Sequence, residues 1–309
     1  MNAWLTDLPK AELHVHLEGS IDAAALCELD PALSREEAEA GFAYADFPGF
    51  LKAFGFVASR LREPSHYALA ARRMFAGLAA QGVRYVEVTL SAGVVLWKGQ
   101  DLAAIWDAVA REGREAPLEV WWNLDAVRQW GPLACWPVVE FAASRVGEGV
   151  VSFGLGGNES TGPVEWFRQH YGYALQHGLR LTCHAGEAEG PASIWASLEV
   201  GAERIGHGFR AIEDPVLVTH LRDHRVPLEI SVTSNVLTRT VASVREHPVR
   251  RLYDAGVPLV INTDDPALFG VTLMDEYALL AREFGFGRAD LEALARNGFE
   301  YGFKTIRTA

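Results

Sequence analysis

The chain has 309 residues, of which 49% are hydrophobic and 22% are charged, a composition typical of a globular protein. Its formal net charge is −12, from 28 Lys and Arg against 40 Asp and Glu, and no basic run concentrates positive potential. We therefore expect neither a nucleic acid nor a membrane as a partner, and the lack of a leader-like N-terminal pattern predicts a cytoplasmic location.

Eight short apolar stretches of strand length recur along the chain. They cover residues 12–17, 83–90, 118–127, 150–157, 179–187, 204–209, 227–235 and 258–266. The segments between them carry apolar residues at helical spacing, and several end in Gly just before the next strand. This alternation predicts an α/β fold, a (β/α)₈ TIM barrel, with one domain over residues 1–309. A doubly wound open sheet is the alternative, but the glycine-rich phosphate loop of that fold does not follow the first strand.

The first connection, residues 21–82, is too long for a single crossover helix. Its aromatic segment FAYADFPGFLKAFGF, residues 42–56, suits a helical insertion that packs over the carboxyl end of the barrel. Such an insertion can serve as a lid over an active site. For most of these aromatic side chains, however, we expect ordinary packing between helices.

Two histidines end the first predicted strand. His14 and His16 are two residues apart, which places both imidazoles on the same face of a strand. A His-X-His tripeptide alone is more often structural than functional. Its meaning therefore depends on the residues that end the other strands.

Polar residues also end three of the later predicted strands. The fifth stretch ends with His184 and Glu187, the sixth holds His207 between two glycines, and the eighth ends in Asp264, Asp265 and a proline. Each has a structural alternative, such as a turn or a helix cap. Their coincidence at the strand ends, where TIM barrels hold their active sites, indicates a functional site. The remaining histidines are expected at the surface or at helix ends, and they are His66, His170, His177, His220, His224 and His247.

Three imidazoles and one carboxylate, without a thiolate, form a donor set that suits zinc with an open position for water. His14, His16, His184 and Asp264 can supply this set. Barrels with two metal ions commonly use a carboxylated lysine at the end of the fourth strand, but VSFGLGGNES contains no lysine. The sequence therefore predicts one zinc ion per chain.

Two further residues are placed for proton transfer. His207 can orient or deprotonate the water, and Glu187 can hand a proton to the substrate. The second role requires that burial or a neighbouring group stabilise the acid form of Glu187. We therefore expect the pKa of Glu187 to be raised.

Six motifs occur in order along the chain, LPKAELHVHLEGS, GLGGNE, HAGE, RIGHG, TSN and NTDDP. Together they resemble the adenosine deaminase family of the amidohydrolase barrels, over essentially the whole predicted barrel. The resemblance implies zinc-dependent hydrolytic deamination of the 6-amino group of an adenosine-like purine nucleoside, with release of ammonia and the 6-oxo product. The zinc ligands that it implies are His14, His16, His184 and Asp264.

The same resemblance implies roles for the other site residues. Glu187 protonates N1 of the purine, His207 positions and activates the water, and Asp264 completes the catalytic set. Asp265 contacts N7, and the backbone N–H of Gly157 faces N3.

Three positions bear on support and specificity. Ser234 is similar to a family serine that supports the histidine after the sixth strand. Glu18 stands where typical adenosine deaminases have an Asp that contacts the ribose 5′-hydroxyl, and Asn158 stands where an Asp usually follows the glycines. Glu18 is therefore a candidate substrate contact, and adenine and 6-aminodeoxyfutalosine are alternative substrates.

Two other functions are disfavoured. A non-purine mononuclear amidohydrolase conflicts with the GLGG segment, which fits a flat purine edge. A catalytically silent binding barrel would be expected to lose a ligand or a proton donor, and here the full set is present. No pattern in the sequence indicates an oligomeric state.

Overall fold

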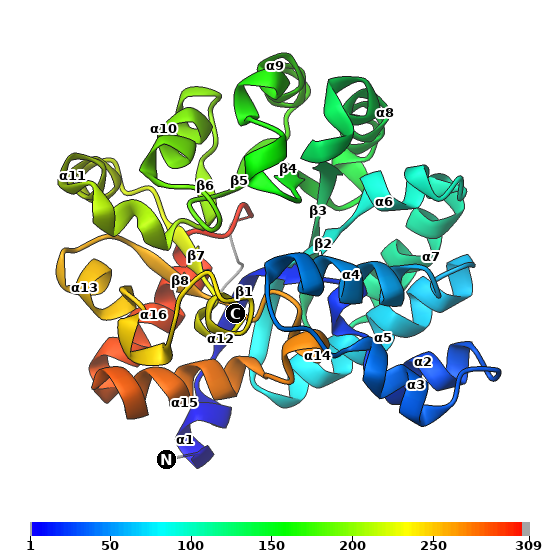
Figure 1. Cartoon of the computed structure of the whole chain (residues 1–309), viewed down its shortest axis with the longest axis horizontal. Coiled ribbons are helices and arrows are strands. Elements are labelled where there is room, and N and C mark those ends of the chain that lie inside the picture. The colour runs from blue at the N-terminus through cyan, green and yellow to red at the C-terminus, as the bar shows by residue number, and fades with distance from the viewer. Residues whose placement is uncertain (1, 305–309) are drawn as a thin grey trace.

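Eight parallel strands pair in sequence order in the computed structural model, which describes residues 2–304 (Figure 1). They are β1 Lys10–His16, β2 Val83–Leu90, β3 Glu119–Val127, β4 Val150–Gly156, β5 Arg180–Ala185, β6 Arg204–His207, β7 Leu228–Ile230 and β8 Leu259–Ile261. The barrel closes where a parallel bridge joins Val15 to Asp264, and where the Asn262 side chain accepts the N–H groups of Leu13 and His14. The predicted (β/α)₈ TIM barrel is confirmed. Of the predicted domain, residues 1 and 305–309 lie outside the described part.

Helices surround this barrel, most of them as an outer ring and a few at its two ends (Figure 1). They are α1 Asn2–Asp7, α2 Ala23–Leu29, α3 Arg35–Gly41, α4 Phe47–Ala58, α5 Pro64–Ala80, α6 Ala92–Trp97, α7 Leu102–Glu115, α8 Gly131–Ser144, α9 Arg168–Gln176, α10 Pro191–Glu199, α11 Pro215–Asp223, α12 Val232–Leu237, α13 Val249–Asp254, α14 Pro266–Phe269, α15 Leu273–Phe284 and α16 Arg288–Glu300. Within residues 2–304, none of these helices combines the length and the apolar character needed to cross a membrane.

Apolar side chains fill the space between the barrel and the outer helices. Trp122 on β3 lies edge-on to Phe75 of α5 and Trp106 of α7, with ring centroids 6.1 and 5.9 Å apart. Strands β1 and β4 are buried at every position, and β1 nevertheless carries a polar side chain at every second residue. Such strands carry polar side chains only where hydrogen bonds or a site satisfy them.

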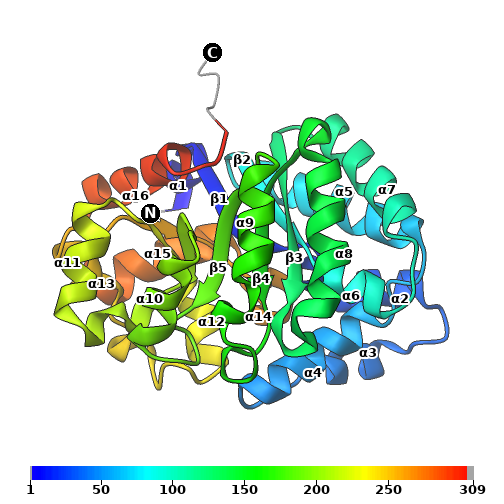
Figure 2. The ribbon, with the colours of Figure 1, turned by 90° about the horizontal axis from the view of Figure 1, so that it is seen from above.

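The predicted helical insertion after the first strand is confirmed and contains α2, α3, α4 and α5. Figure 2 shows α4 at the same end of the barrel as α12 and α14, whereas α1 and α16 lie at the opposite end. Phe47, Phe50 and Phe54 of α4 line a cavity at this end. For these three side chains, the expectation of packing only between helices is wrong.

Two predicted strands end much earlier than expected. β7 ends at Ile230, so the TSN segment lies in α12 and not in a strand, and β8 ends at Ile261, so Asp264 lies in the segment that follows this strand. The physical reason at β7 is a tertiary contact, because the buried Glu276 of α15 accepts the N–H groups of Val232 and Thr233. Apolar composition alone does not encode this contact.

Candidate active site

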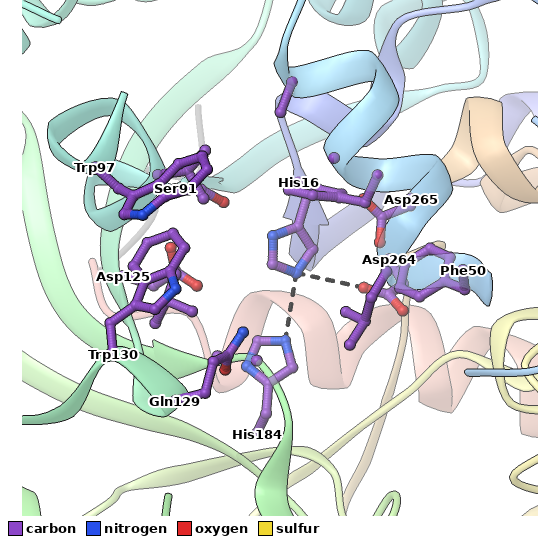
Figure 3. A pocket seen from close by; sticks show the side chains of 18 of the residues that line it. His16, Phe50, Ser91, Trp97, Asp125, Gln129, Trp130, His184, Asp264 and Asp265 are labelled. Carbon is purple, nitrogen blue, oxygen red and sulfur yellow. Dashed lines mark hydrogen bonds and ion pairs between the residues drawn. The ribbon is translucent and has the colours of Figure 1, made fainter. Parts of the chain in front are cut away.

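A cavity of about 620 Å³ lies at the carboxyl ends of the strands. In Figure 3, Trp97 and Trp130 stand across this cavity from Phe50, and the two indole rings stack with centroids 5.4 Å apart. The predicted site residues that line it are His16, Gly157, His184, Glu187, His207, Asp264 and Asp265. The structure thus brings residues from five strand ends together in one space.

Four residues form what we call the metal-donor set, His14, His16, His184 and Asp264, whose ligand atoms all lie within 4.8 Å of one another. Nε2 of His16 is 3.3 Å from Nε2 of His184 and 3.3 Å from Oδ1 of Asp264 (Figure 3). Tetrahedral zinc with bonds of about 2.1 Å holds its ligands about 3.4 Å apart. Nε2 of His14 lies 3.3 Å from Oδ1 of Asp264, and in the described residues this buried nitrogen has no hydrogen-bond partner. The donor set therefore fits a zinc ion.

The charges around this set favour a cation. Burial opposes a charge on His14, but the carboxylates of Asp264 and Glu229 outweigh it and raise the pKa of His14 to about 10. Burial would raise the pKa of Asp264, but His14 and the other imidazoles hold it well below its usual range. Burial lowers the pKa of His16 to about 4, so this imidazole is neutral, whereas His14 must give up a proton when it binds a metal.

A buried ion-pair chain orients His14. Its Nδ1 lies 2.9 Å from the Glu229 carboxylate, which also accepts from Arg204 at 2.6 Å. Arg204 donates in turn to Glu87 at 2.6 Å. Carboxylate partners of this kind hold a metal-binding imidazole in one orientation.

Ser234 supports a different residue from the one expected. Its hydroxyl donates to Oδ2 of Asp264 at 2.7 Å, whereas Nδ1 of His207 faces the side chain of Asn235 at 3.1 Å. The difference arises because this segment is the first turn of α12, where successive side chains point in different directions.

We expect Ser234→Ala to weaken zinc affinity by about 10- to 100-fold, because Asp264 loses the donor that orients it. Affinity would be measured by competition with a chromogenic chelator. The matched control is Ser197→Ala, since the Ser197 hydroxyl is also buried but donates to Ser193 in α10. An affinity equal to that of the control would contradict the assignment of Ser234 to the metal site.

Glu187 is buried beside the metal-donor set. Burial, together with the negative charges of Asp264 and Glu159, raises its pKa well above the ordinary value, as its expected role as an acid requires. The Glu159 carboxylate accepts the N–H groups of Glu187, Ala188 and Glu189 at 3.1, 2.7 and 2.8 Å. Glu159 therefore holds the turn that carries the acid. Sequence reasoning missed this role, although Glu159 belongs to the GLGGNE motif.

His207 ends β6 in the left-handed region, with φ at 61°. Its Nε2 lies 3.6 Å from Oε2 of Glu187, and burial lowers the pKa of His207 to about 3. Of the histidines expected at the surface or at helix ends, His170 and His247 are buried, and His170 lies in the first turn of α9. Nε2 of His247 lies 3.2 Å from Oδ1 of Asn235.

Of the three predicted substrate contacts, Asp265 and Gly157 line the cavity and Glu18 does not. Asp265 lines the cavity, and burial and the charge of Asp264 raise its pKa well above the ordinary value. Gly157 lines it with φ at 92°, and a Cβ there would lie 2.2 Å from Gln129. Glu18 does not line the cavity. It is fully buried and accepts the N–H of Ser91 at 3.1 Å, so its predicted direct contact with substrate is not supported.

Asp125 is a cavity residue that sequence reasoning missed. It lies near the end of β3, is 3% exposed, and has one carboxyl oxygen without a partner in the described residues. Burial and the charge of Glu18 raise its pKa well above the ordinary value. A Cβ at Gly156 would come within 2.6 Å of the Asp125 carboxylate, so only glycine at position 156 leaves space for this carboxylate. The available signal was an acidic residue in the apolar run LEVWWNLDAV.

Comparisons with known proteins agree with this geometry. A model of the adenosine deaminase family matches residues 9–306. The chain is 38% identical to an aminodeoxyfutalosine deaminase of Streptomyces avermitilis, over 98% of this chain and 88% of the relative. It is 33% identical to an adenosine deaminase of Serratia proteamaculans, over 96% of this chain and 94% of the relative. Among solved structures, an adenine deaminase from Arthrobacter aurescens matches with a TM-score of 0.90 and 26% identity, over 96% of this chain and 94% of that chain.

Proposed function

The chain belongs to the adenosine deaminase family, and from this premise we propose that it removes the 6-amino group of a 6-aminopurine nucleoside by zinc-dependent hydrolysis. One observation carries the proposal. A donor set that fits zinc, a carboxyl group whose raised pKa favours its acid form and a neutral imidazole meet at one cavity.

The side chains around the metal-donor set have complementary tasks. Zinc held there would supply a Lewis acid that makes water nucleophilic at neutral pH. Glu187, in its acid form, hands its proton to N1 of the purine as the water oxygen attacks C6. The water gives up two protons: one passes to the amino group, which leaves as ammonia when the C6–N bond breaks, and the other restores the acid form of Glu187. The raised pKa of Asp265 favours its acid form, and a protonated carboxyl group can donate a hydrogen bond to N7, an acceptor. His207 faces the same space.

We propose aminodeoxyfutalosine, a 6-aminopurine nucleoside with an enlarged 5′ substituent, as the first substrate to test. The relative from Streptomyces avermitilis carries this substrate in its name. The cavity of about 620 Å³ lies in the range of about 300–1,000 Å³ typical of pockets for drug-sized ligands, so it has room for a nucleoside. It also reaches the exposed Trp97, which offers a flat apolar surface at the mouth. Adenosine, expected from the sequence, and adenine are the alternatives.

A substrate panel tests the proposal. The zinc-loaded protein would be assayed with aminodeoxyfutalosine, adenosine, deoxyadenosine and adenine, by the change in purine absorbance and by released ammonia. We expect the highest kcat/KM with the nucleoside that carries the larger substituent. If none of the four compounds released ammonia, the proposed function would be wrong.

We expect Trp97→Ala to raise KM for aminodeoxyfutalosine by about 2- to 12-fold, because one stacked aromatic contact contributes about 0.5–1.5 kcal/mol. The value of kcat should change little, and KM for adenine should not change, since the base does not reach the mouth. The matched control is Trp166→Ala, because Trp166 is also exposed but does not line the cavity. An equal effect on all substrates would exclude a selective role for Trp97.

A further inference from the structure

Three buried polar side chains form a line from the start of α13 to the candidate active site. The backbone N–H of Val249 donates to Nδ1 of His247 at 3.2 Å, and Nε2 of His247 lies 3.2 Å from Oδ1 of Asn235. Nδ2 of Asn235 lies 3.1 Å from Nδ1 of His207. His247, Asn235 and His207 are 3%, 0% and 1% exposed, so water does not compete for these contacts.

The first contact determines the proton position on His247. A backbone N–H can only donate, so Nδ1 of His247 accepts. Burial lowers the pKa of His247 to about 3, so the ring is neutral and carries its single proton on Nε2. That proton is donated to Oδ1 of Asn235, the only oxygen of the amide.

The orientation of the amide then determines the proton position on His207. With its oxygen towards His247, Asn235 presents its NH₂ group to Nδ1 of His207, and an NH₂ group can only donate. Nδ1 of His207 therefore accepts, and the proton of the neutral ring lies on Nε2. The backbone of Asn235 is held on both sides, since its N–H donates to Ser231 and its carbonyl accepts the Thr240 hydroxyl.

We propose that Asn235 and His247 are positioning residues that keep the proton of neutral His207 on Nε2, the nitrogen that faces the cavity. Nε2 then donates a hydrogen bond and has no lone pair with which to remove a proton. It points towards Oε2 of Glu187, 3.6 Å away. Of the two roles left open by the sequence, orienting the water or deprotonating it, the geometry points to the first.

The tautomer itself follows from contacts within the chain, whereas the identity of the oxygen that accepts from Nε2 rests on the proposed function. A spectroscopic experiment separates the two. The zinc-loaded, full-length protein would be labelled with ¹⁵N-histidine, and the ring nitrogens would be observed through their two-bond couplings to the ring protons. We expect His207 to show a protonated Nε2 and an unprotonated Nδ1.

Two variants test whether the hydrogen bonds from His247 through Asn235 determine which nitrogen of His207 carries the proton. Asn235→Asp replaces the donating NH₂ by an acceptor, so the proton of His207 should move to Nδ1, and kcat should fall by about 10- to 100-fold with little change in KM. His247→Gln keeps a donor towards Oδ1 of Asn235 and should retain the wild-type signals of His207. The control is His170→Gln, because His170 is also buried, but its ring packs on Trp136 and lies 2.9 Å from the Pro132 carbonyl, outside the site.

A wild-type spectrum with the proton of His207 on Nδ1 would overturn the proposal. This measurement uses the wild-type protein alone, so it does not depend on whether a variant folds. An unchanged His207 pattern in folded Asn235→Asp would overturn the role of Asn235. If the wild-type protein released no ammonia from any 6-aminopurine, the proposed function would fall, but the nitrogen signals would still decide the tautomer.

Discussion

Glu187→Gln is expected to lower kcat by about 10²- to 10⁴-fold, the range that a positioned general acid contributes. Glutamine has the same shape and can keep the N–H contact with Glu159, but it has no acidic proton for N1 of the purine. Because the pKa of Glu187 is raised, its acid form is present below that pKa and is lost as the pH rises through it. The alkaline decline of kcat/KM that this group causes should therefore vanish in the variant.

The measurement is a pH profile of kcat and kcat/KM, together with the zinc content of each protein. Glu189→Gln is the matched control, since Glu189 lies in the same turn but its side chain is exposed. Both variants should hold wild-type amounts of zinc. A pH profile of Glu187→Gln identical to that of the wild type would rule out the acid role.

His184→Ala should reduce bound zinc well below one ion per chain and lower kcat/KM by at least about 10³-fold. The donor set then lacks one of its three imidazoles. A metal contributes several kcal/mol of transition-state stabilisation, and about 1.4 kcal/mol corresponds to a factor of ten. The folded structure should persist, because His184 is only partly buried and its removal leaves no buried charge unpaired.

Metal content by mass spectrometry and thermal unfolding would be measured side by side. His177→Ala is the control, since His177 is exposed on the outer ring of helices and lies outside the cavity. Removal of metal from the wild type by a chelator should abolish activity, and one equivalent of zinc should restore it. Full activity of His184→Ala at low zinc content would contradict a metal-dependent reaction.

Local sequence patterns were sufficient to predict most strands of the barrel. The predicted second strand, residues 83–90, coincides with β2, and the other seven lie within a few residues of the observed strands. The metal-donor set was also predictable, because each of its members ends a strand or follows one closely. Parallel strands of a barrel place such ends at one face whatever the packing details are.

Contacts between distant segments were not predictable in the same way. Ser234 and Asn235 lie next to each other in the sequence, yet one contacts Asp264 and the other His207. His247 looked like a loop residue, because nothing near it in the sequence indicates that it packs against Asn235. Asp125 lines the cavity but was not among the predicted site residues, whereas Glu18, a predicted substrate contact, does not line it.

The sequence by itself determined the order of strands and helices, the chemical types at the strand ends and the family, since these depend on periodicity and residue identity. Only the tertiary structure decided which side chain supports which, that Glu18 lies behind Ser91 rather than against the cavity, and where the proton of His207 resides. The physical reason is that hydrogen bonds depend on distances of a few tenths of an ångström. Those distances are set when the barrel closes between Val15 and Asp264, residues almost at opposite ends of the chain.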